Sequence, residues 1–519
     1  MGQNEMKVDT PPLAGLPLPT SQSSVLGSTE LAEVSPQSFF RDAGAGVFIF
    51  AVLLFAYLNV VRIPYAFMDD YFWLNLSLRS PADVVGFLGA QGRPLNAVIL
   101  RAAFQMAGRV ANLRWVRLAT IVESAAMGWA FYFAVRRGGW KRFPAAVLAT
   151  LACLTPSVQV YIAWATSVPL PWSGILAIMA ALVTWRAIDR GSRPWVGYGG
   201  AAILLAISAI IYQPTVMMFW PVAALDLFRR EREKDRLKRF AIYLAVAAAG
   251  LFLGWLAFKW GLVEFKHWVK DERSGLTRHP WQKVKWFVGQ PLTEILNPFR
   301  IWGRPSIAIG VGAFLIVGLV VLLGGSFLQR MVGVLLAAAM IPLSYLPNLV
   351  AVENWSSYRT QIGPALLVLV LLWVTVNGLW RMIARHPLPV PVLLAAIFFA
   401  AVLAGYNVTV FFAEPQMIEL TEFRQALSRP EVRAAKQIEF LQPSWVERLT
   451  PFSKYDEFGR NSLHAGWVPQ SAINLIRREF DPDAGRIPVQ IYPDFRGAWT
   501  TPLPPGDVLL DFRDLRNVH

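Results

Sequence analysis

Long runs of uncharged, mostly apolar residues constrain this chain more than any other feature. Residues 43–61 are 19 consecutive uncharged positions, about the length of a helix that crosses the roughly 30 Å hydrocarbon core of a bilayer. Seven more such runs lie at 143–185, 194–225, 240–258, 305–329, 331–352, 360–380 and 387–413. Windows of this length predict transmembrane helices, and the first two of these seven are long enough for two spans each. We therefore expect an all-α polytopic membrane protein.

Together with a crossing at 116–135, the runs predict about eleven spans. They lie near 43–62, 116–135, 144–162, 168–186, 196–212, 214–228, 240–260, 306–327, 332–350, 361–381 and 390–412. Residues 1–42, rich in Pro, Ser, Gly and Thr, are expected to be a disordered tail. Residues 413–519 change character. A helix over about 414–435 and alternating strands at 486–492 and 507–513 predict a small extracytoplasmic α/β domain there.

Clusters of Lys and Arg orient the spans, because loops on the cytoplasmic side carry an excess of positive charge. The clearest cluster is 229–239, and others lie at 136–142, 186–193 and 381–385. Placing these and the N-terminal tail in the cytoplasm puts loops 63–114, 261–305 and 350–360 outside with 413–519. Loop 63–114 is expected to carry an interfacial helix near 94–108, since that stretch contains Arg101 and is short for a span.

The charge of the chain is concentrated beside the predicted spans. The formal net charge is +15, yet residues 414–519 carry 13 Lys and Arg against 15 Asp and Glu. Basic charge next to membrane spans favours anionic head groups over nucleic acid as a partner. The single cysteine, Cys153, excludes an intramolecular disulfide, and the five histidines lack zinc-ligand spacing. No cofactor is expected; a metal, if used, would be a divalent ion bound by carboxylates.

Two adjacent carboxylates, Asp69 and Asp70, follow the first predicted span within the sequence Met68-Asp69-Asp70-Tyr71. At the boundary between membrane and water, a carboxylate can deprotonate a polar substrate while a lipid-borne substrate approaches from the side. Neighbouring like charge or partial burial raises a carboxylate's pKa and suits it to act as a general base. A solvated helix end is the alternative. We take Asp69 and Asp70 as candidate catalytic residues, with Tyr71 as a neighbouring candidate.

The same loop continues to Gly92-Arg93-Pro94-Leu95, where Pro94 suits the first turn of a helix. An arginine at a helix N-terminus can hold a phosphate bidentately, so Arg93 is a candidate phosphate ligand. The alternative for Arg93 is snorkelling to lipid head groups. Tyr212 and Gln213 are weaker polar candidates near the outer end of a span.

Loop 261–305 is basic although the topology places it outside. Its candidate ligands for an anionic lipid such as a polyprenyl phosphate are Arg273, Arg278, Lys283 and Lys285, interleaved with tryptophans. Either the topology is wrong or the loop binds such a lipid, and the tryptophans fit an aromatic interface belt or sugar stacking. In loop 350–360, Arg359 is a further phosphate candidate or an interface anchor. Glu353 and Tyr358 are polar candidates beside it.

These motifs resemble the GT-C superfamily of polytopic glycosyltransferases, which use polyprenyl-phosphate sugars. The resemblance is nearest to the O-antigen-modifying glucosyltransferases, judging by Asp69-Asp70, Gly92-Arg93-Pro94-Leu95 and Tyr212-Gln213. It covers about 43–412, and residues 413–519 resemble nothing we can name. Some superfamily members carry Asp-Glu where this chain has Asp-Asp, which leaves open which carboxylate is the base.

The resemblance implies inverting transfer of a sugar, a hexose such as glucose, at the outer face of a bacterial inner membrane. The partners would be a polyprenyl-phosphate sugar donor, an envelope glycan or glycolipid acceptor such as lipopolysaccharide, and membrane lipids. Asp69 by preference, otherwise Asp70, would deprotonate the acceptor hydroxyl. Arg93, Arg359 and the basic residues of 261–305 would stabilise the departing polyprenyl phosphate.

Two other functions stay open at the level of sequence. A transporter or flippase of a lipid-linked sugar would carry charged residues deep within several spans. Apart from Glu123, the predicted spans of this chain are nearly free of charged residues. A polysaccharide polymerase or ligase would also use basic outer loops, but would depend on Arg and His instead of a carboxylate after the first span.

Overall fold

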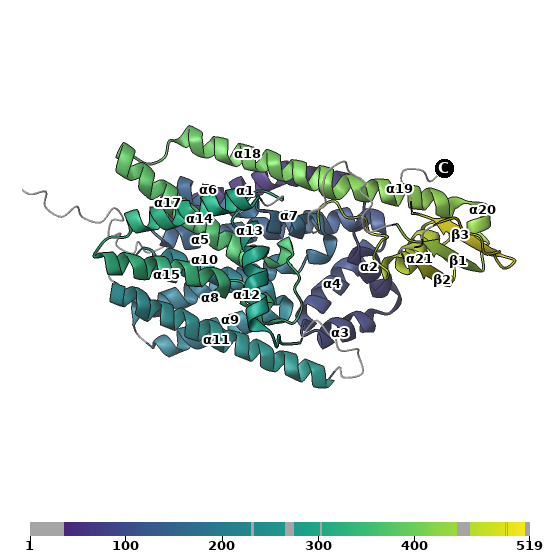
Figure 1. Cartoon of the computed structure of the whole chain (residues 1–519), viewed down its shortest axis with the longest axis horizontal. Coiled ribbons are helices and arrows are strands. Elements are labelled where there is room, and N and C mark those ends of the chain that lie inside the picture. The colour runs from purple at the N-terminus through teal and green to yellow at the C-terminus, as the bar shows by residue number, and fades with distance from the viewer. Residues whose placement is uncertain are drawn as a thin grey trace, which may run out of the picture.

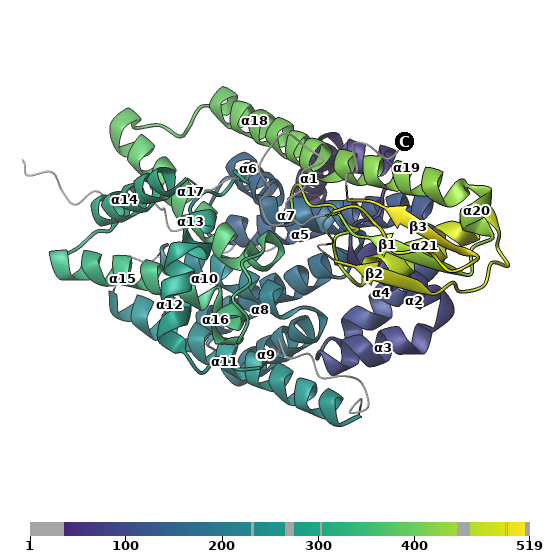
Figure 2. The ribbon, with the colours of Figure 1, turned by 45° about the vertical axis from the view of Figure 1, so that its right-hand side comes forward.

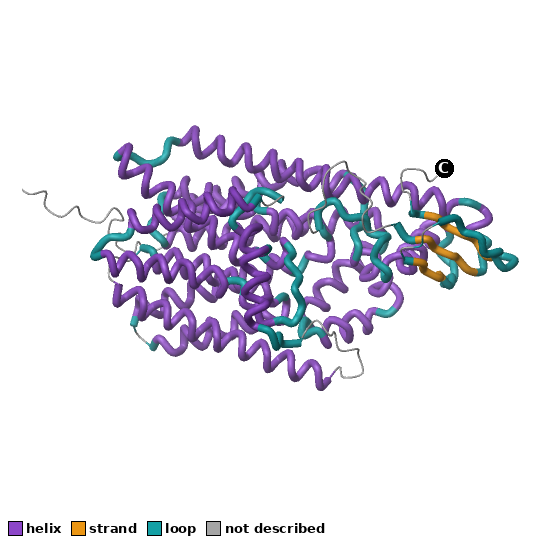
Figure 3. Tube along the Cα trace, viewed as in Figure 1, coloured by secondary structure: helices purple, strands orange, loops and turns teal. Residues whose placement is uncertain are grey.

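The structure is a computed structural model that describes residues 36–191, 193–229, 233–264, 275–301, 304–443, 457–493, 495 and 497–513. Long helices run side by side to form a bundle, and a small sheet lies beyond one of its ends (Figures 1 and 3). This arrangement confirms the predicted class of a polytopic helical membrane protein with a small α/β part at the C-terminus.

The helices before residue 229 are α1 (Pro36–Arg62), α2 (Asp69–Arg79), α3 (Pro81–Ala90), α4 (Pro94–Ala107), α5 (Leu113–Arg137), α6 (Arg142–Cys153), α7 (Pro156–Ala163), α8 (Leu170–Arg190), α9 (Pro194–Ile211) and α10 (Phe219–Leu227). Those after it are α11 (Glu233–Glu264), α12 (Pro280–Gly289), α13 (Pro291–Ile295), α14 (Pro305–Leu322), α15 (Phe327–Leu343), α16 (Leu346–Val350), α17 (Ile362–Ala384), α18 (Val390–Val408), α19 (Glu414–Ser428), α20 (Pro430–Arg433) and α21 (Val468–Phe480).

Among the described residues, eight helices are long and apolar enough to cross a membrane, or nine if the bent pair α6–α7 counts as one span. Two of the eleven expected spans therefore have a different form. Segment 214–228 is a 3₁₀ turn, Gln213–Met218, followed by the nine-residue α10, and segment 332–350 is covered by α15 and the short α16.

The 3₁₀ turn and α10 still run from one end of the bundle to the other. At one end, Tyr212 lies under the guanidinium of Arg93. At the other end, Asp226 binds Arg239, which also binds Asp189 at the end of α8. Every residue of α10 is buried, so this short segment passes through the protein core instead of facing lipid.

The break between α6 and α7 bends the chain by 61°. Pro156 begins α7 and cannot continue the hydrogen bonding of α6. Side chains satisfy the carbonyl groups that the break leaves over: the Tyr57 hydroxyl donates to the Cys153 carbonyl at 2.9 Å, and Gln159 donates to the Leu154 carbonyl at 2.8 Å. Backbone carbonyl groups need such side-chain donors where water is excluded, because no water can bind them there.

Region 63–114 contains three helices, α2, α3 and α4, where we expected a single interfacial helix. Pro81 and Pro94 each occupy the first turn of the helix that they begin, which is the position where proline is best tolerated. The three helices pack against one another near the C-terminal region (Figure 2).

The C-terminal region begins without a break in the chain's longest helix. α18, a single π-helical turn at Thr409–Ala413 and α19 form 39 continuous helical residues, about 58 Å at 1.5 Å per residue. This length exceeds the bilayer core, so the helix extends beyond it. The sheet has the order β2-β1-β3, with β1 (Gln437–Leu441) parallel to both β2 (Val489–Tyr492) and β3 (Asp507–Asp511).

Gly92, at the turn before α4, has two reasons to be glycine. Its φ is +75°, and a Cβ there would lie 2.2 Å from Cδ2 of Phe258 on α11. Gly108 at the end of α4 also has a positive φ, +66°, but a Cβ there would meet only the Gln105 carbonyl at 3.9 Å.

We expect Gly108→Ala to lower the free energy of unfolding by only about 1–2 kcal/mol, the penalty for a residue with a Cβ in the left-handed conformation. Gly92→Ala should cost about 1–3 kcal/mol more, because the new methyl group overpacks the contact with α11. Thermal unfolding of the purified variants would measure the difference, and equal melting temperatures would contradict the contact.

Candidate functional site

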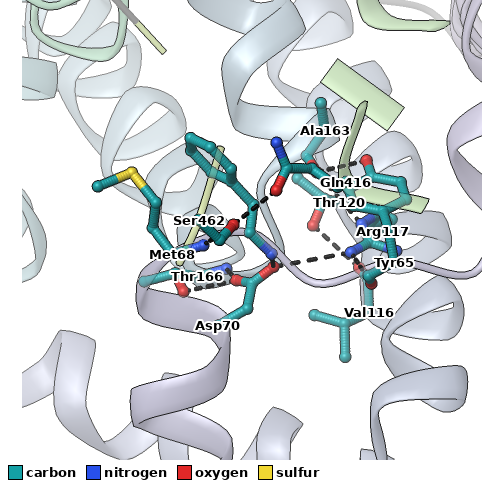
Figure 4. Close-up of polar contacts among 11 residues, drawn as sticks. Tyr65, Met68, Asp70, Val116, Arg117, Thr120, Ala163, Thr166, Gln416 and Ser462 are labelled. Carbon is teal, nitrogen blue, oxygen red and sulfur yellow. Dashed lines mark hydrogen bonds and ion pairs between the residues drawn. The ribbon is translucent and has the colours of Figure 1, made fainter. Parts of the chain in front are cut away.

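Asp70 is completely buried at the first turn of α2, and its carboxylate accepts three hydrogen bonds (Figure 4). Oδ1 accepts from the backbone N–H and the hydroxyl of Thr166, at 2.8 and 2.7 Å. Oδ2 accepts from the backbone N–H of Phe67 at 3.0 Å. Burial raises the pKa of Asp70, and Arg117 and these donors oppose the rise. The carboxylate is thus fixed between the chain that precedes it and the segment between α7 and α8.

Arg117, on the first turns of α5, supplies the positive charge opposite Asp70. Its Nη2 lies 3.6 Å from Asp70 Oδ2, and both side chains are fully buried. The guanidinium also donates to the carbonyl groups of Tyr65 (2.6 Å) and Ala163 (3.2 Å) and lies 3.5 Å from the centre of the Tyr65 ring. This arrangement joins α5 to the segment that precedes α2 and to the last residue of α7.

Asp69 differs from Asp70 because it remains partly exposed. Its Oδ1 accepts a 2.9 Å hydrogen bond from the indole N–H of Trp467, the residue before α21. The two neighbouring carboxylates therefore point into different environments, one into the core and one toward the C-terminal region.

Met68, immediately before the pair, has a strained backbone with φ 41° and ψ −105°. Such a conformation costs about 1–3 kcal/mol and persists only where surrounding contacts impose it. Its N–H donates to the Ser462 hydroxyl at 2.8 Å (Figure 4), and that hydroxyl donates to Gln416 at 2.6 Å. The backbone N–H groups of Ser462 and Leu463 in turn donate to the buried Glu419 carboxylate. The C-terminal region therefore holds the turn that presents Asp69.

Arg93, Tyr212 and Gln213 lie together at this end of the bundle. The Arg93 Nε donates to Gln213 Oε1 at 3.0 Å, and the guanidinium lies 4.9 Å from the centre of the Tyr212 ring. Arg93 directly precedes α4 and is partly exposed. Arg93 and the adjacent Tyr212 and Gln213, which are distant from Arg93 in sequence, form one cationic and aromatic cluster.

Arg359 forms a second cluster with Trp164, whose ring centre lies 4.5 Å from the guanidinium. The Arg359 Nε lies 3.7 Å from Glu457 Oε1, so the C-terminal region contributes here as well. Trp164 also contacts the ring of Phe67 and directly follows Ala163, which Arg117 binds. Trp164 thus connects Arg359 to the surroundings of Asp70.

The two arginine clusters are joined through Tyr161 on α7. Its hydroxyl lies 2.9 Å from the Thr215 hydroxyl and donates to the Arg359 carbonyl at 3.0 Å. Thr215 is two residues beyond Gln213, the partner of Arg93. Arg93 and Arg359 therefore belong to one network of contacts at the end of the bundle that carries Asp69.

The other candidate residues have different positions. Lys283 is buried and donates to the backbone carbonyls of Glu353 and Asn348, and burial lowers the pKa of its ammonium. Tyr358 is buried and donates to the Ile301 carbonyl at 2.7 Å, and Tyr71 is also buried. Arg278 and Lys285 are exposed, whereas Arg273 lies outside the described residues.

Sequence reasoning missed five residues that surround the carboxylates and arginines: Arg117, Trp164, Thr166, Trp467 and Glu457. Arg117 carried a usable signal, because an ionisable residue at the start of a membrane span is a functional or pairing residue by default. The part of the chain that the structure describes contains no group of three or more His, Cys, Asp or Glu side chains arranged to hold a metal ion.

Comparisons with known proteins give distant similarity in structure and none in sequence. No protein-family model matches the chain, and no curated protein matches it in sequence. Among solved structures, it is similar to the archaeal oligosaccharyltransferase AglB from Archaeoglobus fulgidus, in complex with an inhibitory peptide and a dolichol-phosphate, with a TM-score of 0.36 and 11% identity. The similarity covers 76% of this chain and 59% of the AglB chain.

Removing the charge of each carboxylate should affect the stability of the protein very differently. Asp70→Asn should destabilise the protein by about 3–5 kcal/mol, because it leaves the buried Arg117 charge without its partner. Asp69→Asn should change stability by less than about 0.5 kcal/mol, since that side chain is partly exposed. Thermal unfolding of the purified proteins separates the two, and equal stability of both variants would contradict the assignment of Asp70 as the buried partner.

Proposed function

We propose that the chain is an inverting glycosyltransferase that moves a sugar from a polyprenyl-phosphate donor to an envelope glycan or glycolipid. The observation that carries this proposal is the partly exposed carboxylate of Asp69 at the end of the bundle that also bears Arg93 and Arg359. The motif resemblance to GT-C enzymes supports it. The membrane would be the bacterial inner membrane, with the site on its outer face.

Asp69 is the proposed general base. An acceptor hydroxyl would lose its proton to Asp69 as its oxygen attacks C1 of the donor sugar, and the bond from C1 to the phosphate oxygen would break. Positioned acid–base groups of this kind accelerate reactions about 10²–10⁴-fold. Asp70 is proposed as a positioning residue, because its carboxylate is occupied by Thr166, Phe67 and Arg117.

Arg93 and Arg359 are the proposed ligands of the donor phosphate. The departing polyprenyl phosphate gains negative charge as the bond breaks, and fixed cations near it lower the barrier. The aromatic rings beside the two guanidinium groups, Tyr212 and Trp164, fix their orientation. The free energy that drives transfer would come from the bond between the sugar and the phosphate of the donor lipid, so the proposed reaction requires no nucleotide site.

Buried charge inside the spans offers little support for a transporter. Arg117 and Asp70 neutralise each other near the start of α5, and their other partners, backbone groups and the Thr166 hydroxyl, lie at the same end of the bundle. A transport pathway would instead need ionisable side chains deep within several spans, and Glu123 in α5 is the residue of that kind that the sequence singles out.

A deletion strain complemented with wild type, Asp69→Asn or Asp69→Glu tests the function. Mass spectrometry of envelope glycans and glycolipids should show a sugar-sized mass that wild type restores and Asp69→Asn does not. Asp69→Glu keeps the carboxylate and should retain part of the activity. Restoration by Asp69→Asn at matched protein levels would show that the chemistry lies elsewhere or that the chain only moves the lipid.

Arg93→Gln and Arg359→Gln should each lower the rate of sugar transfer about 10²-fold or more, because each removes a fixed cation from the leaving phosphate. Arg381→Gln, at the cytoplasmic end that the sequence predicts, is the matched control and should keep wild-type activity. Transfer assays with a purified polyprenyl-phosphate sugar measure all three. Full activity of both Arg93→Gln and Arg359→Gln would refute the phosphate assignment.

A further inference from the structure

A cavity of about 670 Å³ lies between the membrane part and the C-terminal region, away from the carboxylate pair. Its lining includes Leu78, Arg109, Arg424, Leu475, Arg478 and Glu479. α2 and α21 pack together and run in the same direction: Asp69 and Trp467 meet at their first turns, whereas Leu78 and Leu475 meet at this cavity. The length of α2, about 15 Å, separates the cavity from Asp69.

The cavity is strongly basic. Three of its lining residues are arginines, and its one acidic residue, Glu479, is already bound by Arg424 through Nε (3.0 Å) and Nη2 (2.8 Å). Arg79, at the end of α2, adds a further charge beside Arg478. Burial lowers the pKa of Arg79, and the nearby charges of Arg478 and Arg486 lower it further.

Three guanidinium nitrogens at or beside the cavity are buried without a hydrogen-bond partner within the described chain. One is Nε of Arg478, which lines the cavity, and the others are Nε and Nη2 of Arg79, which follows the lining residue Leu78. Buried polar groups are normally hydrogen-bonded, and buried charges are normally paired. Like charges gathered around a cavity with unsatisfied N–H donors are arranged as a receptor for an anion, and guanidinium groups match the geometry of phosphate and carboxylate.

We propose that this cavity binds a phosphate or carboxylate oxyanion carried by the acceptor. Its volume is in the range that accommodates small ligands. The link to the acceptor rests on the proposed function; the binding of an oxyanion does not. An acceptor with its anionic group in the cavity and its hydroxyl at Asp69 would have to span about 15 Å, so it would be larger than a monosaccharide.

Titration calorimetry tests the site directly, with pyrophosphate as the probe and the full-length protein in neutral phosphatidylcholine nanodiscs. Wild type should bind, and the double variant Arg79→Gln/Arg478→Gln should bind at least tenfold more weakly. Arg477→Gln is the matched control on the same helix, since Arg477 does not line the cavity and donates to the Arg433 carbonyl. Absence of binding, or equal weakening in Arg477→Gln, would overturn the proposal.

Leu78→Trp is a second variant that tests the site even if the double variant misfolds. It keeps every charge but fills part of the cavity from a residue that is 36% exposed, and it should weaken pyrophosphate binding as well. Binding unchanged in Leu78→Trp would show an adventitious ion only.

The source of the anion is decided by repeating the titration in nanodiscs that contain anionic phosphatidylglycerol. Unchanged affinity is expected if the oxyanion belongs to a glycan acceptor. If phosphatidylglycerol weakens the apparent binding of pyrophosphate to wild type but has no such effect on the double variant, the cavity binds lipid head groups. That result would overturn the acceptor assignment. None of these titrations depends on sugar transfer, so a failed transfer assay and a failed binding assay are separate results.

Discussion

The buried ion pair between Asp70 and Arg117 fixes the geometry around the two carboxylates. One charge comes from α2 and the other from α5, and both are removed from water. Arg117 also binds the carbonyl groups of Tyr65 and Ala163, while Asp70 binds Thr166. Three parts of the chain that are distant in sequence are therefore fixed around one pair of opposite charges. Pairs of this kind need such additional hydrogen bonds to offset the cost of burial.

The pair also explains why two neighbouring carboxylates can have different roles. Successive residues on a helix point in directions about 100° apart, since 3.6 residues make a turn. Once Asp70 faces the core, Asp69 is directed toward Trp467 and the C-terminal region. The C-terminal region, whose Ser462 holds Met68 in a strained conformation, is thus part of the site's scaffold. Its proposed oxyanion cavity extends the same contact surface along α2.

Sequence reasoning predicted the polytopic helical class because apolar runs of bilayer length have few other solutions. It could not predict that 214–228 crosses as a 3₁₀ turn and a short buried helix, since composition does not distinguish a core segment from a lipid-facing one. β1 is five residues long, too short for a clear alternation. α21 was detectable in principle, because Ala472, Ile473 and Ile476 recur at helical spacing.

The candidate site residues were chosen from the sequence for a related reason. Asp69, Asp70 and Arg359 stand beside predicted spans and Arg93 at the start of a predicted interfacial helix, where charged residues are conspicuous next to apolar sequence. A preference for Asp69 over Asp70 came only from the family resemblance, since tertiary packing decides which carboxylate is buried. Lys283 has a positively charged side chain that could bind phosphate, yet its ammonium donates to the backbone carbonyls of Asn348 and Glu353. Charge type predicts what a side chain can bind, but not which partner the fold brings to it.

A structure of the protein with a bound polyprenyl-phosphate sugar would show whether Asp69, Arg93 and Arg359 form the transfer site. We expect the donor phosphate within about 3 Å of guanidinium nitrogens of Arg93 and Arg359, the hydrogen-bond distance of charged pairs. The C1 atom of the sugar should face the space beside Asp69, with Asp70 still bound to Arg117. A phosphate held at the opposite end of the bundle, or by neither arginine, would contradict that assignment.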